Sequence, residues 1–478
     1  MTYFEEKNSE TGVREKHRQA ALRGTAKKLN LSNAEIVPSA LEFSKNKVFT
    51  SPVTFQVLME NLPDAYIVGG AVRDEVMGLE PHDIDIVTSA TPDEVLKMFK
   101  RSYDVGGQKY GTVLVMLSDE LKEVEVTTMR REISGGRHPK VVFTKSILED
   151  LFRRDFTMNA MAMDIEGNII DPYGGREDIK NLTIRTVYDP YETLDINTGD
   201  PLRAIRAVRF AHKLKYFSIE PTLEDAIRKA DLSKISGERI YMELEKMFEK
   251  DASRALVYLK HYGILEKILP EINVMDCCQH NIEHHPEGNC FEHTLCAMEF
   301  VNDESMLVKM AVLLHDIGKP VVWVEGSTTY YAHEKAGVAP GRAVMKRLGR
   351  PKVEQDAIAF VIKNHMKVHK LHEMKPSKRR ALYDSPHFDL LLKVCAADGS
   401  MRGHDPCEIE RFVELDVTTR TSPVKPLLDG HTIMEYGISP GPLIKKIQDD
   451  LIEQQIEGNL STEKDALEYF MRKYVITT

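Results

Sequence analysis

Residues 65–87 read AYIVGGAVRDEVMGLEPHDIDIV, and this stretch decides the fold of the first domain. The apolar run 65–68 predicts a short strand. Gly69 and Gly70 then turn the chain into a short predicted helix over 71–77. A glycine pair lets the backbone approach a ligand closely, and the N–H groups that begin a helix attract phosphate. The turn is therefore a candidate phosphate-binding turn.

The stretch ends in DIDIV, which predicts a strand over 83–87. Side chains alternate between the two faces of a strand, so we expect Asp83 and Asp85 on one face and Ile84 and Ile86 in the core. Two neighbouring carboxylates repel each other unless a cation lies between them. The pattern therefore predicts a divalent-metal site facing the phosphate-binding turn, an arrangement that suits nucleotidyl transfer.

Neither half of this pattern is specific alone, because a glycine pair is usually only a turn and D-x-D is usually surface polarity. In this order, with Arg73 and Asp74 between them, the two halves resemble the signature of the polymerase-β-like nucleotidyltransferases. In detail, VGGAVRD followed by DIDIV is similar to the class II CCA-adding enzymes and bacterial poly(A) polymerases. The resemblance implies an α/β head in which the two aspartates hold Mg²⁺ and in which Gly70 and Arg73 bind nucleotide.

Two further features of the head follow. The alternating run 124–128, VEVTT, predicts a strand carrying Glu125. A solvent-facing glutamate fits this pattern equally well, but the family has a similar E-V-T-T strand, which implies a third catalytic carboxylate. Residues 130–144, RREISGGRHPKVVFT, are polar, basic and glycine-rich, which by itself predicts a mobile loop. They resemble the family's flexible loop, which is thought to help switch between nucleotides.

The segment 148–164, LEDLFRRDFTMNAMAMD, runs from a charge cluster into a predicted apolar strand over 156–163. Arginine suits phosphate through its forked donors, and aspartate accepts a hydrogen bond from a ribose hydroxyl. A surface ion-pair cluster is the alternative. The run resembles the family's R-R-D-F-T-x-N-A motif, which implies that Arg154 binds phosphate and Asp155 binds ribose.

Residues 200–210, DPLRAIRAVRF, place three arginines at intervals of three on roughly one helix face, with Asp200 standing where an N-cap would. Such a stripe is most often a solvated face, but after a nucleotide-binding head a ligand-facing ridge is also plausible. The segment resembles the family's D-x-x-R helix, which reads the incoming base. This implies that Asp200 and Arg203 choose the base, while Arg206 and Arg209 lie nearer the triphosphate or stack on the base.

A second constellation contains an adjacent His-Asp pair in 313–319, LLHDIGK, with further histidines and an aspartate at helix-sized intervals. Histidine and carboxylate together suit a first-row divalent metal, whereas a lone buried histidine is usually structural. The pattern resembles the HD phosphohydrolase domain, which implies a site for a metal such as Ni²⁺, Mn²⁺ or Co²⁺. An HD domain retained only as scaffold is the alternative. The implied central ligands are His293, His315, Asp316 and Asp398, with His333 and His365 as candidate second-metal or phosphate ligands. The histidines at 280, 284 and 285 are expected in an irregular loop.

Composition describes an ordinary globular protein: 478 residues, 42% hydrophobic and 29% charged, which predicts two to four domains. No apolar run approaches membrane-spanning length, and residues 1–19 contain acids and no apolar core, so neither a membrane partner nor a secretory signal is expected. The six cysteines form no C-x-x-C pair, which favours a cytoplasmic, reducing location. The net charge of −10 means that any RNA contact must come from local patches.

We expect an α/β polymerase-β-like nucleotidyltransferase head followed by an all-α neck and body that contains an HD domain. The predicted parts are an N-terminal polar helical extension (1–48), the head (49–175), a helical neck and RNA-binding body (176–275), the HD domain (276–415) and a C-terminal helical tail (416–478). Within the body, 238–240 (ERI) matches a further family element, although its pattern alone shows only an amphipathic helix.

The resemblance implies metal-dependent addition of CMP and AMP, from CTP and ATP, to a tRNA 3′ end, with HD-domain phosphatase or cyclic phosphodiesterase chemistry in repair. DNA is not an expected partner. The alternatives are a poly(A) polymerase, an enzyme that adds only CC or only A, an HD nucleotide phosphohydrolase with a vestigial head, and a non-enzymatic RNA-binding module. The segment 105–113 lacks the arginine-rich strand expected of a poly(A) polymerase. The carboxylates and arginines of the head argue against a vestigial one.

Overall fold

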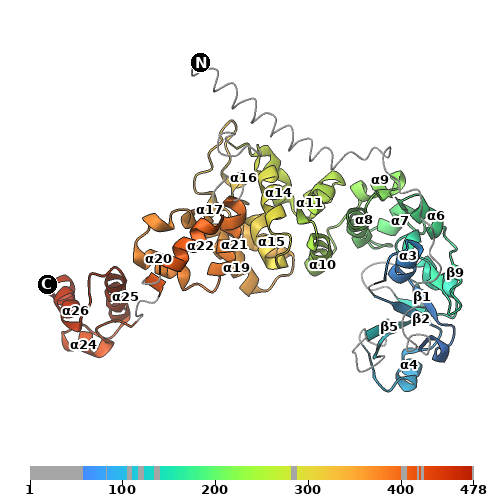
Figure 1. Ribbon diagram of the computed structural model, residues 1–478, viewed down its shortest axis with the longest axis horizontal. Helices are drawn as coiled ribbons and strands as arrows, with labels where there is room; N and C mark the ends of the chain where they lie inside the picture. Colours follow the sequence, from blue (N-terminus) through green and yellow to red (C-terminus); the bar gives the residue numbers. More distant parts are fainter. Residues whose placement is uncertain are drawn as a thin grey trace, which may run out of the picture. The chain divides into compact units, whose positions relative to one another are not determined.

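The computed structural model describes residues 58–81, 83–104, 110–116, 123–133, 140–280, 288–399, 406–416, 419–420 and 425–475. The predicted N-terminal extension, the middle of the predicted loop 130–144 and the histidines at 284 and 285 lie outside these residues. The chain divides into two compact units, Met1–Asn273 and Val274–Thr478. Figure 1 follows their elements in chain order. Within the described residues, no helix combines the length and apolarity needed to cross a membrane.

A seven-stranded mixed sheet forms the head of the first unit, as the sequence predicts (blue to green in Figure 1). From edge to edge its strands are β3 (Ser102–Asp104), β4 (Thr112–Met116), β5 (Glu123–Thr128), β2 (Asp85–Thr88), β1 (Tyr66–Val68), β8 (Ala162–Met163) and β9 (Ile169–Ile170). The pair β2–β5 is parallel and the other neighbours are antiparallel. The parallel pair matters most for function because it places Asp85 directly beside Glu125.

Local sequence signals account for the helices of the head. Helix α3 (Gly70–Val76) follows β1 through Gly69, whose φ of 72° favours glycine. Helix α4 (Pro92–Met98) has the predicted proline at its first position and begins with a capping box. In that box the Thr91 backbone N–H donates to the Glu94 carboxylate at 2.8 Å. One core cluster of the head contains Val68, Val87, Met129, Leu151 and Ala162.

Two strand predictions for the head need correction. The strand β2 begins at Asp85, so Asp83 and Ile84 precede it, and Ile84 is only partly buried. The apolar run 156–163 is not one strand, because its start forms a 3-10 turn, η2 (Thr157–Asn159). Asp155 explains this turn: its Oδ1 accepts from the Phe156 backbone N–H at 2.8 Å and from Asn159 Nδ2 at 3.0 Å. Such local bonds compete with a sheet ladder.

A hairpin and a helical neck complete the first unit. The hairpin pairs β6 (Arg130–Glu132) with β7 (Val141–Phe143), so the described ends of the predicted mobile loop are ordered as strands. The leucine and isoleucine spacing over 256–269 predicts a single helix, but Gly263, with φ of 70°, separates α11 from α12. The remaining elements of the first unit are α5 (Ile147–Phe152), α6 (Gly175–Lys180), β10 (Thr183–Ile184), α7 (Pro190–Leu194), α8 (Leu202–Lys213), β11 (Ser218–Ile219), α9 (Pro221–Lys229), α10 (Gly237–Phe248), α11 (Ala252–His261), α12 (Leu265–Ile268) and α13 (Pro270–Asn273), of which α5 belongs to the head.

The regular elements in the described part of the second unit are helices, joined by turns and loops. Its longer helices are α14 (Cys290–Phe300), α15 (Met306–Leu314), α18 (Val338–Arg347), α19 (Lys352–Val368), α20 (Pro376–Tyr383), α21 (Phe388–Gly399) and α22 (Pro406–Leu415). Two single-turn helices, α16 (Lys319–Val322) and α17 (His333–Ala336), lie between α15 and α18. Gly318 permits their close packing, because a Cβ added to it would lie 2.0 Å from the His333 carbonyl oxygen.

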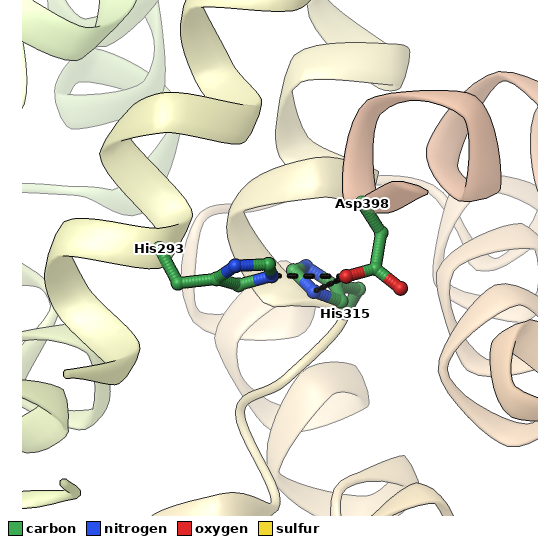
Figure 2. A group of neighbouring side chains, drawn as sticks. All are labelled: His293, His315 and Asp398. Atoms are coloured by element: carbon green, nitrogen blue, oxygen red, sulfur yellow. Dashed lines mark ion pairs between the residues drawn. The ribbon is translucent and has the colours of Figure 1, made fainter. Parts of the chain in front are cut away.

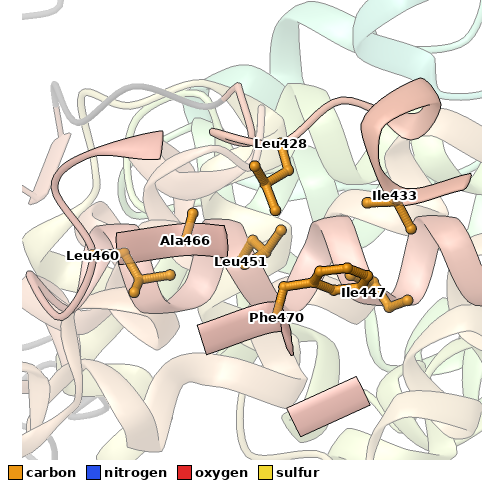
Figure 3. Packing of buried hydrophobic residues seen from close by; sticks show 7 residues of the cluster. All are labelled: Leu428, Ile433, Ile447, Leu451, Leu460, Ala466 and Phe470. Carbon is orange, nitrogen blue, oxygen red and sulfur yellow. The ribbon is translucent and has the colours of Figure 1, made fainter. Parts of the chain in front are cut away.

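The C-terminal tail has a small core of its own (Figure 3). It is formed by α24 (Gly430–Glu435), α25 (Pro442–Ile456) and α26 (Glu463–Phe470). The spacing of Leu443, Ile447 and Leu451 predicts one apolar face of an amphipathic helix. Ile447 and Leu451 are fully buried and contribute to this core together with Phe470. Leu443, predicted on the same face, is 46% exposed.

Candidate functional site

Most of the predicted nucleotide-binding residues line one open cavity of about 390 Å³ in the first unit. The Gly69–Gly70 turn and Asp85 contribute from the sheet, while α8 and α10 contribute from the neck. The lining residues are Gly69, Gly70, Arg73, Asp85, Glu132, Arg153, Arg154, Asp155, Asn159, Asp200, Leu202, Arg203, Arg206, Phe210 and Arg239. Residues that lie up to 170 positions apart thus share one concave surface.

The central strands of the sheet bring carboxylates together beside the cavity, which Asp85 lines. Asp85 and Glu125 lie side by side in register on neighbouring strands. Burial and the negative charge of Asp83 raise the pKa of Asp85, whereas Arg154 lowers it. Burial, Asp85 and Asp83 raise the pKa of Glu125. Mutual repulsion of this kind is relieved by a cation, so the residues fit a divalent metal.

The head carboxylates are neighbours but do not form a closed ligand shell. Asp83 is exposed and precedes the strand, and neither Asp83 nor Glu125 lines the cavity. Among the described residues, the groups that bring three ligand atoms within 4.8 Å of one another belong to the second unit. The cavity turn is tightly packed, because a Cβ on Gly69 would lie 3.0 Å from Arg154 Nη1 and 3.9 Å from Asp85 Oδ2.

Arg154 and its neighbour Arg153 share one buried acid. Asp150 is fully buried, and its Oδ1 lies 2.8 Å from Arg153 Nη2 while its Oδ2 lies 3.1 Å from Arg154 Nη2. Although burial alone would raise it, the two arginines hold the pKa of Asp150 below its usual value. Burial lowers the pKa of Arg154. Asp150 therefore orients both guanidinium groups at the cavity wall, where phosphate would meet them.

Asp155 forms a bidentate ion pair with Arg206 from the neck. Its Oδ2 accepts from Arg206 Nε at 2.8 Å and from Nη2 at 2.6 Å. Burial opposes ionisation, but Arg206 and Arg203 outweigh it and hold the pKa of Asp155 well below its usual value. The predicted contact of Asp155 with ribose remains a prediction, and it would have to share the carboxylate with this pair.

Asp200 pairs with Arg239, a residue whose role the sequence pattern did not reveal. Arg239 Nη2 donates to Asp200 Oδ2 at 2.7 Å, and the Leu202 backbone N–H donates to Oδ1 at 3.2 Å. Helix α8 begins at Leu202, one residue later than an N-cap at Asp200 predicts. Arg203 Nη2 donates to the Arg153 carbonyl oxygen at 2.6 Å. The match of 238–240 to a family element was the only signal that could have indicated Arg239.

The structure separates the three arginines of the predicted stripe. Arg203 and Arg206 line the cavity, whereas Arg209 does not. Arg209 is buried, donates from Nε to Glu243 Oε2 at 2.6 Å, and lies 4.4 Å from the centre of the Phe210 ring. Glu243 on α10 thus engages the arginine that faces away from the cavity.

The predicted HD residues of the second unit form two buried triads. The first contains His293, His315 and Asp398, with Asp398 Oδ1 at 3.0 Å from His293 Nε2 and 4.0 Å from His315 Nε2 (Figure 2). The second contains Asp316, His333 and His365. Asp316, predicted as a central ligand beside Asp398, therefore groups with the two residues predicted as second-metal candidates.

The histidine rings are oriented for a cation. The Nδ1 atoms of His315, His333 and His365 lie 2.6, 2.8 and 2.8 Å from backbone carbonyl oxygens three residues earlier. A carbonyl only accepts, so each Nδ1 donates and each Nε2 presents a lone pair to the interior. The His333 and His365 Nε2 atoms are 3.1 Å apart, and two facing lone pairs need a proton or a metal between them. The donor set fits a divalent transition metal.

Asp316 connects the two triads. Its Oδ2 lies 3.2 Å from His315 Nε2, and its Oδ1 lies 3.2 Å from His333 Nε2 and 3.6 Å from His365 Nε2. Lys319 Nζ also lies 2.5 Å from Oδ2. Although burial alone would raise it, His315 and Lys319 hold the pKa of Asp316 well below its usual value. An ionised carboxylate that faces both triads can bridge two cations.

Three residues beside the triads had no role assigned from the sequence. Lys319 follows the His-Asp pair in the quoted LLHDIGK segment and is buried. His280, expected in a loop, is buried, and its Nε2 lies 3.0 Å from Lys319 Nζ. His369 Nε2 lies 3.1 Å from Asp398 Oδ2 and steadies that ligand. Neither histidine has a spacing that would have distinguished it.

Family models match most of this architecture. Residues 65–185 match the poly A polymerase head domain, 216–275 match a probable RNA and SrmB-binding site of polymerase A, and 282–399 match the HD domain. The first match contains the sheet and most of the cavity, and the third contains both triads.

Relatives and solved structures agree with the models. The multifunctional CCA protein of Chromobacterium violaceum is 31% identical over 353 residues, covering 70% of this chain and 84% of that protein. The CCA-adding enzyme of Geobacillus sp. (strain WCH70) is 46% identical over 212 residues, covering 44% of this chain and 52% of that protein. The crystal structure of the Bacillus stearothermophilus CCA-adding enzyme in complex with CTP has a TM-score of 0.62 at 27% identity, covering 89% of this chain and 99% of that one.

The paired triads predict that the second unit binds two divalent ions. Isothermal titration calorimetry of the chelator-treated chain measures how many Ni²⁺ ions bind per chain. We expect His333→Ala to bind one ion fewer than the wild type, because that change removes a ligand of one triad only. Asp316→Ala should weaken both sites, since its carboxylate faces both triads. His431→Ala is the matched control, because that side chain is 80% exposed. An unchanged stoichiometry in His333→Ala would contradict the two-ion arrangement.

Proposed function

Because the chain belongs to the family of the multifunctional CCA proteins and CCA-adding enzymes, we propose that it adds CMP and AMP, from CTP and ATP, to the 3′ end of tRNA without a nucleic-acid template. One observation carries the proposal: a single cavity is lined by Asp85 of the sheet and by Asp200 and Arg203 at the start of α8. Nucleotide chemistry and base choice then occur on the same bound nucleotide.

The proposed reaction is a phosphoryl displacement. The terminal ribose hydroxyl of tRNA loses its proton and attacks the α-phosphate of CTP or ATP, so that a new P–O bond forms. The bond between the α-phosphorus and the oxygen that bridges to the β-phosphate breaks, and pyrophosphate leaves. Asp83, Asp85 and Glu125 would hold Mg²⁺, which when bound neutralises charge on the reacting phosphate. Arg154, held by Asp150, supplies paired donors to the triphosphate, and the Gly69–Gly70 turn lets the backbone approach it. Asp155 would bind ribose.

Base choice is assigned to Asp200 and Arg203. Cytosine and adenine each present an exocyclic amino donor beside a ring-nitrogen acceptor, whereas uracil and guanine present the opposite pattern. A carboxylate only accepts and a guanidinium only donates, so the pair matches C and A. Arg239 supports this role, because its ion pair orients Asp200 while the carboxylate keeps further acceptor capacity. Arg206 would face the triphosphate.

The second unit is proposed to act on damaged RNA ends as a phosphatase or 2′,3′-cyclic phosphodiesterase. Its triads offer imidazole and carboxylate donors that suit Ni²⁺, Mn²⁺ or Co²⁺, which when bound activate water and neutralise phosphate charge. Lys319 adds a buried positive charge beside Asp316, where a phosphate would bind.

Two alternatives to full CCA addition are open to test. A poly(A) polymerase would share the same head, and a partial enzyme would add only CC or only A. We expect tRNA transcripts that end before C, after C and after CC to be extended by CTP, CTP and ATP respectively, with products resolved to single nucleotides. Extension of every transcript by ATP alone would favour the poly(A) polymerase.

Removal of a head carboxylate should abolish addition and spare RNA binding. We expect Asp85→Ala, and likewise Asp83→Ala, to lower kcat for CMP addition by at least about 1,000-fold, because metal contacts act on the transition state more than on distant RNA contacts. The tRNA Kd should stay close to that of the wild type. Asp64→Ala is the matched control, because Asp64 is exposed and lies in a turn outside the cavity. Near-normal addition by Asp85→Ala would contradict the proposed role of the head carboxylates in nucleotide addition.

Asp200→Asn should change base selectivity. Asparagine replaces one acceptor oxygen with a donor, so we expect the preference for CTP and ATP over UTP and GTP to fall by about 100-fold or more, or addition to be lost. Competition assays with all four nucleotides measure this preference. Asp231→Asn is the matched control, because Asp231 is exposed and accepts from the Ser233 backbone N–H without lining either cavity. Unchanged preference and rate in Asp200→Asn would mean that the base is read elsewhere.

The two chemistries should be separable. We expect His315→Ala to abolish hydrolysis of a 2′,3′-cyclic phosphate by the chain while CCA addition continues, because the triads and the nucleotide cavity belong to different compact units. His431→Ala should alter neither activity. If the wild type hydrolyses no phosphate ester with Mg²⁺, Mn²⁺, Ni²⁺ or Co²⁺, the HD domain is scaffold.

A further inference from the structure

A second cavity, of about 810 Å³, opens beside the nucleotide cavity and has an aromatic wall. The wall contains Phe152, Tyr173 and Tyr188. The Phe152 ring stacks on Tyr188 with centroids 5.3 Å apart and lies 6.2 Å from the Tyr173 ring. Phe152 is nevertheless 52% exposed, so much of its ring is accessible to a ligand.

The two cavities are neighbours and share part of their lining. Arg153 and Glu132 line both of them. Arg203, one of the residues assigned to base choice, contacts the dividing wall: its Nη2 donates to the Arg153 carbonyl oxygen at 2.6 Å, and its Nη1 lies 3.4 Å from the Tyr188 hydroxyl. A ligand in the second cavity therefore lies one residue away from a nucleotide in the first.

The charges of the lining residues indicate which kind of ligand the second cavity can bind. Arg131 and Arg153 are matched by Glu132 and Glu149 among its lining residues, so it offers no excess of positive charge to a triphosphate. Arg153 is in addition paired with Asp150 at 2.8 Å. The uncharged faces of aromatic rings dominate instead, and these favour the flat faces of nucleobases.

We propose that this aromatic cavity stacks the 3′-terminal base of the single-stranded RNA that receives the nucleotide. The inference rests on the proposed function, because nucleotidyl transfer requires the RNA 3′ hydroxyl to reach the α-phosphate in the adjoining cavity. Unpaired RNA ends present bases that stack on aromatic side chains regardless of sequence. The terminal base of the acceptor RNA changes after every addition. A surface that binds the base by stacking, and not by hydrogen bonds to its edge, can accept each of these bases.

The second cavity also has an ordered rim. Asp195 accepts from the Asn197 and Thr198 backbone N–H groups at 2.9 and 2.8 Å, which holds the loop that supplies Asn197 and Thr198 to the lining. The opposite rim comes from the hairpin strand β6 through Arg131 and Glu132. The RNA base would thus enter between a fixed loop and the hairpin.

The test uses the full chain and a tRNA carrying 2-aminopurine as its 3′-terminal base, without added nucleotide. Stacking quenches 2-aminopurine, so we expect quenching on binding to the wild type and its loss with Phe152→Ala. Phe152→Leu, which keeps an apolar side chain without the ring, should behave like Phe152→Ala, and Phe152→Tyr should restore quenching. Tyr103→Ala, at an aromatic on β3 that is 62% exposed and outside both cavities, is the matched control.

Steady-state addition gives the second measurement. Loss of one base–aromatic stack should raise KM for tRNA by about 5- to 100-fold while KM for CTP stays within about twofold. Unchanged quenching and unchanged KM for tRNA in both Phe152→Ala and Phe152→Leu would overturn the inference, as would a rise in KM for CTP alone. If the wild type quenches 2-aminopurine through Phe152 but adds no nucleotide, the proposed function fails and the RNA site stands.

Discussion

The bidentate ion pair between Asp155 and Arg206 joins the head to the first long helix of the neck, and the nucleotide cavity depends on it. Arg206 gives two donors to one carboxylate oxygen, at 2.8 and 2.6 Å, while Asn159 and a backbone N–H satisfy the other. A buried ion pair contributes to a unique structure only when its remaining hydrogen-bonding capacity is met in this way. Because Arg203 lies on α8 and Asp200 lies just before it, the same pair also fixes how these two residues face the Gly69–Gly70 turn across the cavity.

The cavity places several positive charges together by giving each a nearby carboxylate. Asp150 holds Arg153 and Arg154, Asp200 holds Arg239, and Asp155 holds Arg206. The guanidinium groups are therefore oriented before any ligand arrives, which lowers the cost of ordering them on binding. The chain as a whole is acidic, with a net charge of −10, so recognition of a polyanion has to come from such a local arrangement.

The two units arrange their candidate metal ligands by different means. In the head, Asp85 and Glu125 stand in register on neighbouring strands, and burial together with the negative charge of Asp83 raises the pKa of both carboxyls. In the second unit, backbone carbonyls three residues earlier select the histidine tautomer that turns Nε2 inward, and Asp316 faces both triads. The first arrangement suits a hard, exchangeable cation such as Mg²⁺, and the second suits a more tightly held transition metal.

The sequence by itself determined the features that depend on neighbouring residues. The Gly69–Gly70 turn, the capping box at Thr91, the helix that carries the arginines and the helical setting of His315 and Asp316 are all local, and the motifs indicated which side chains belong to each site. The order of the strands could not be read in the same way, since β2 pairs with β5 in parallel across an intervening hairpin.

Only the tertiary structure decided how those side chains divide their roles. A period of three places Arg203, Arg206 and Arg209 on one helix face, but Glu243, which lies 34 residues from Arg209, engages that arginine away from the cavity. Arg239 enters the site through an ion pair with Asp200 across 39 residues, and Asp316 groups with His333 and His365 rather than with Asp398 alone. These outcomes rest on contacts between distant elements, and the spacing of residues along one element carries no information about which partner the fold will bring to it.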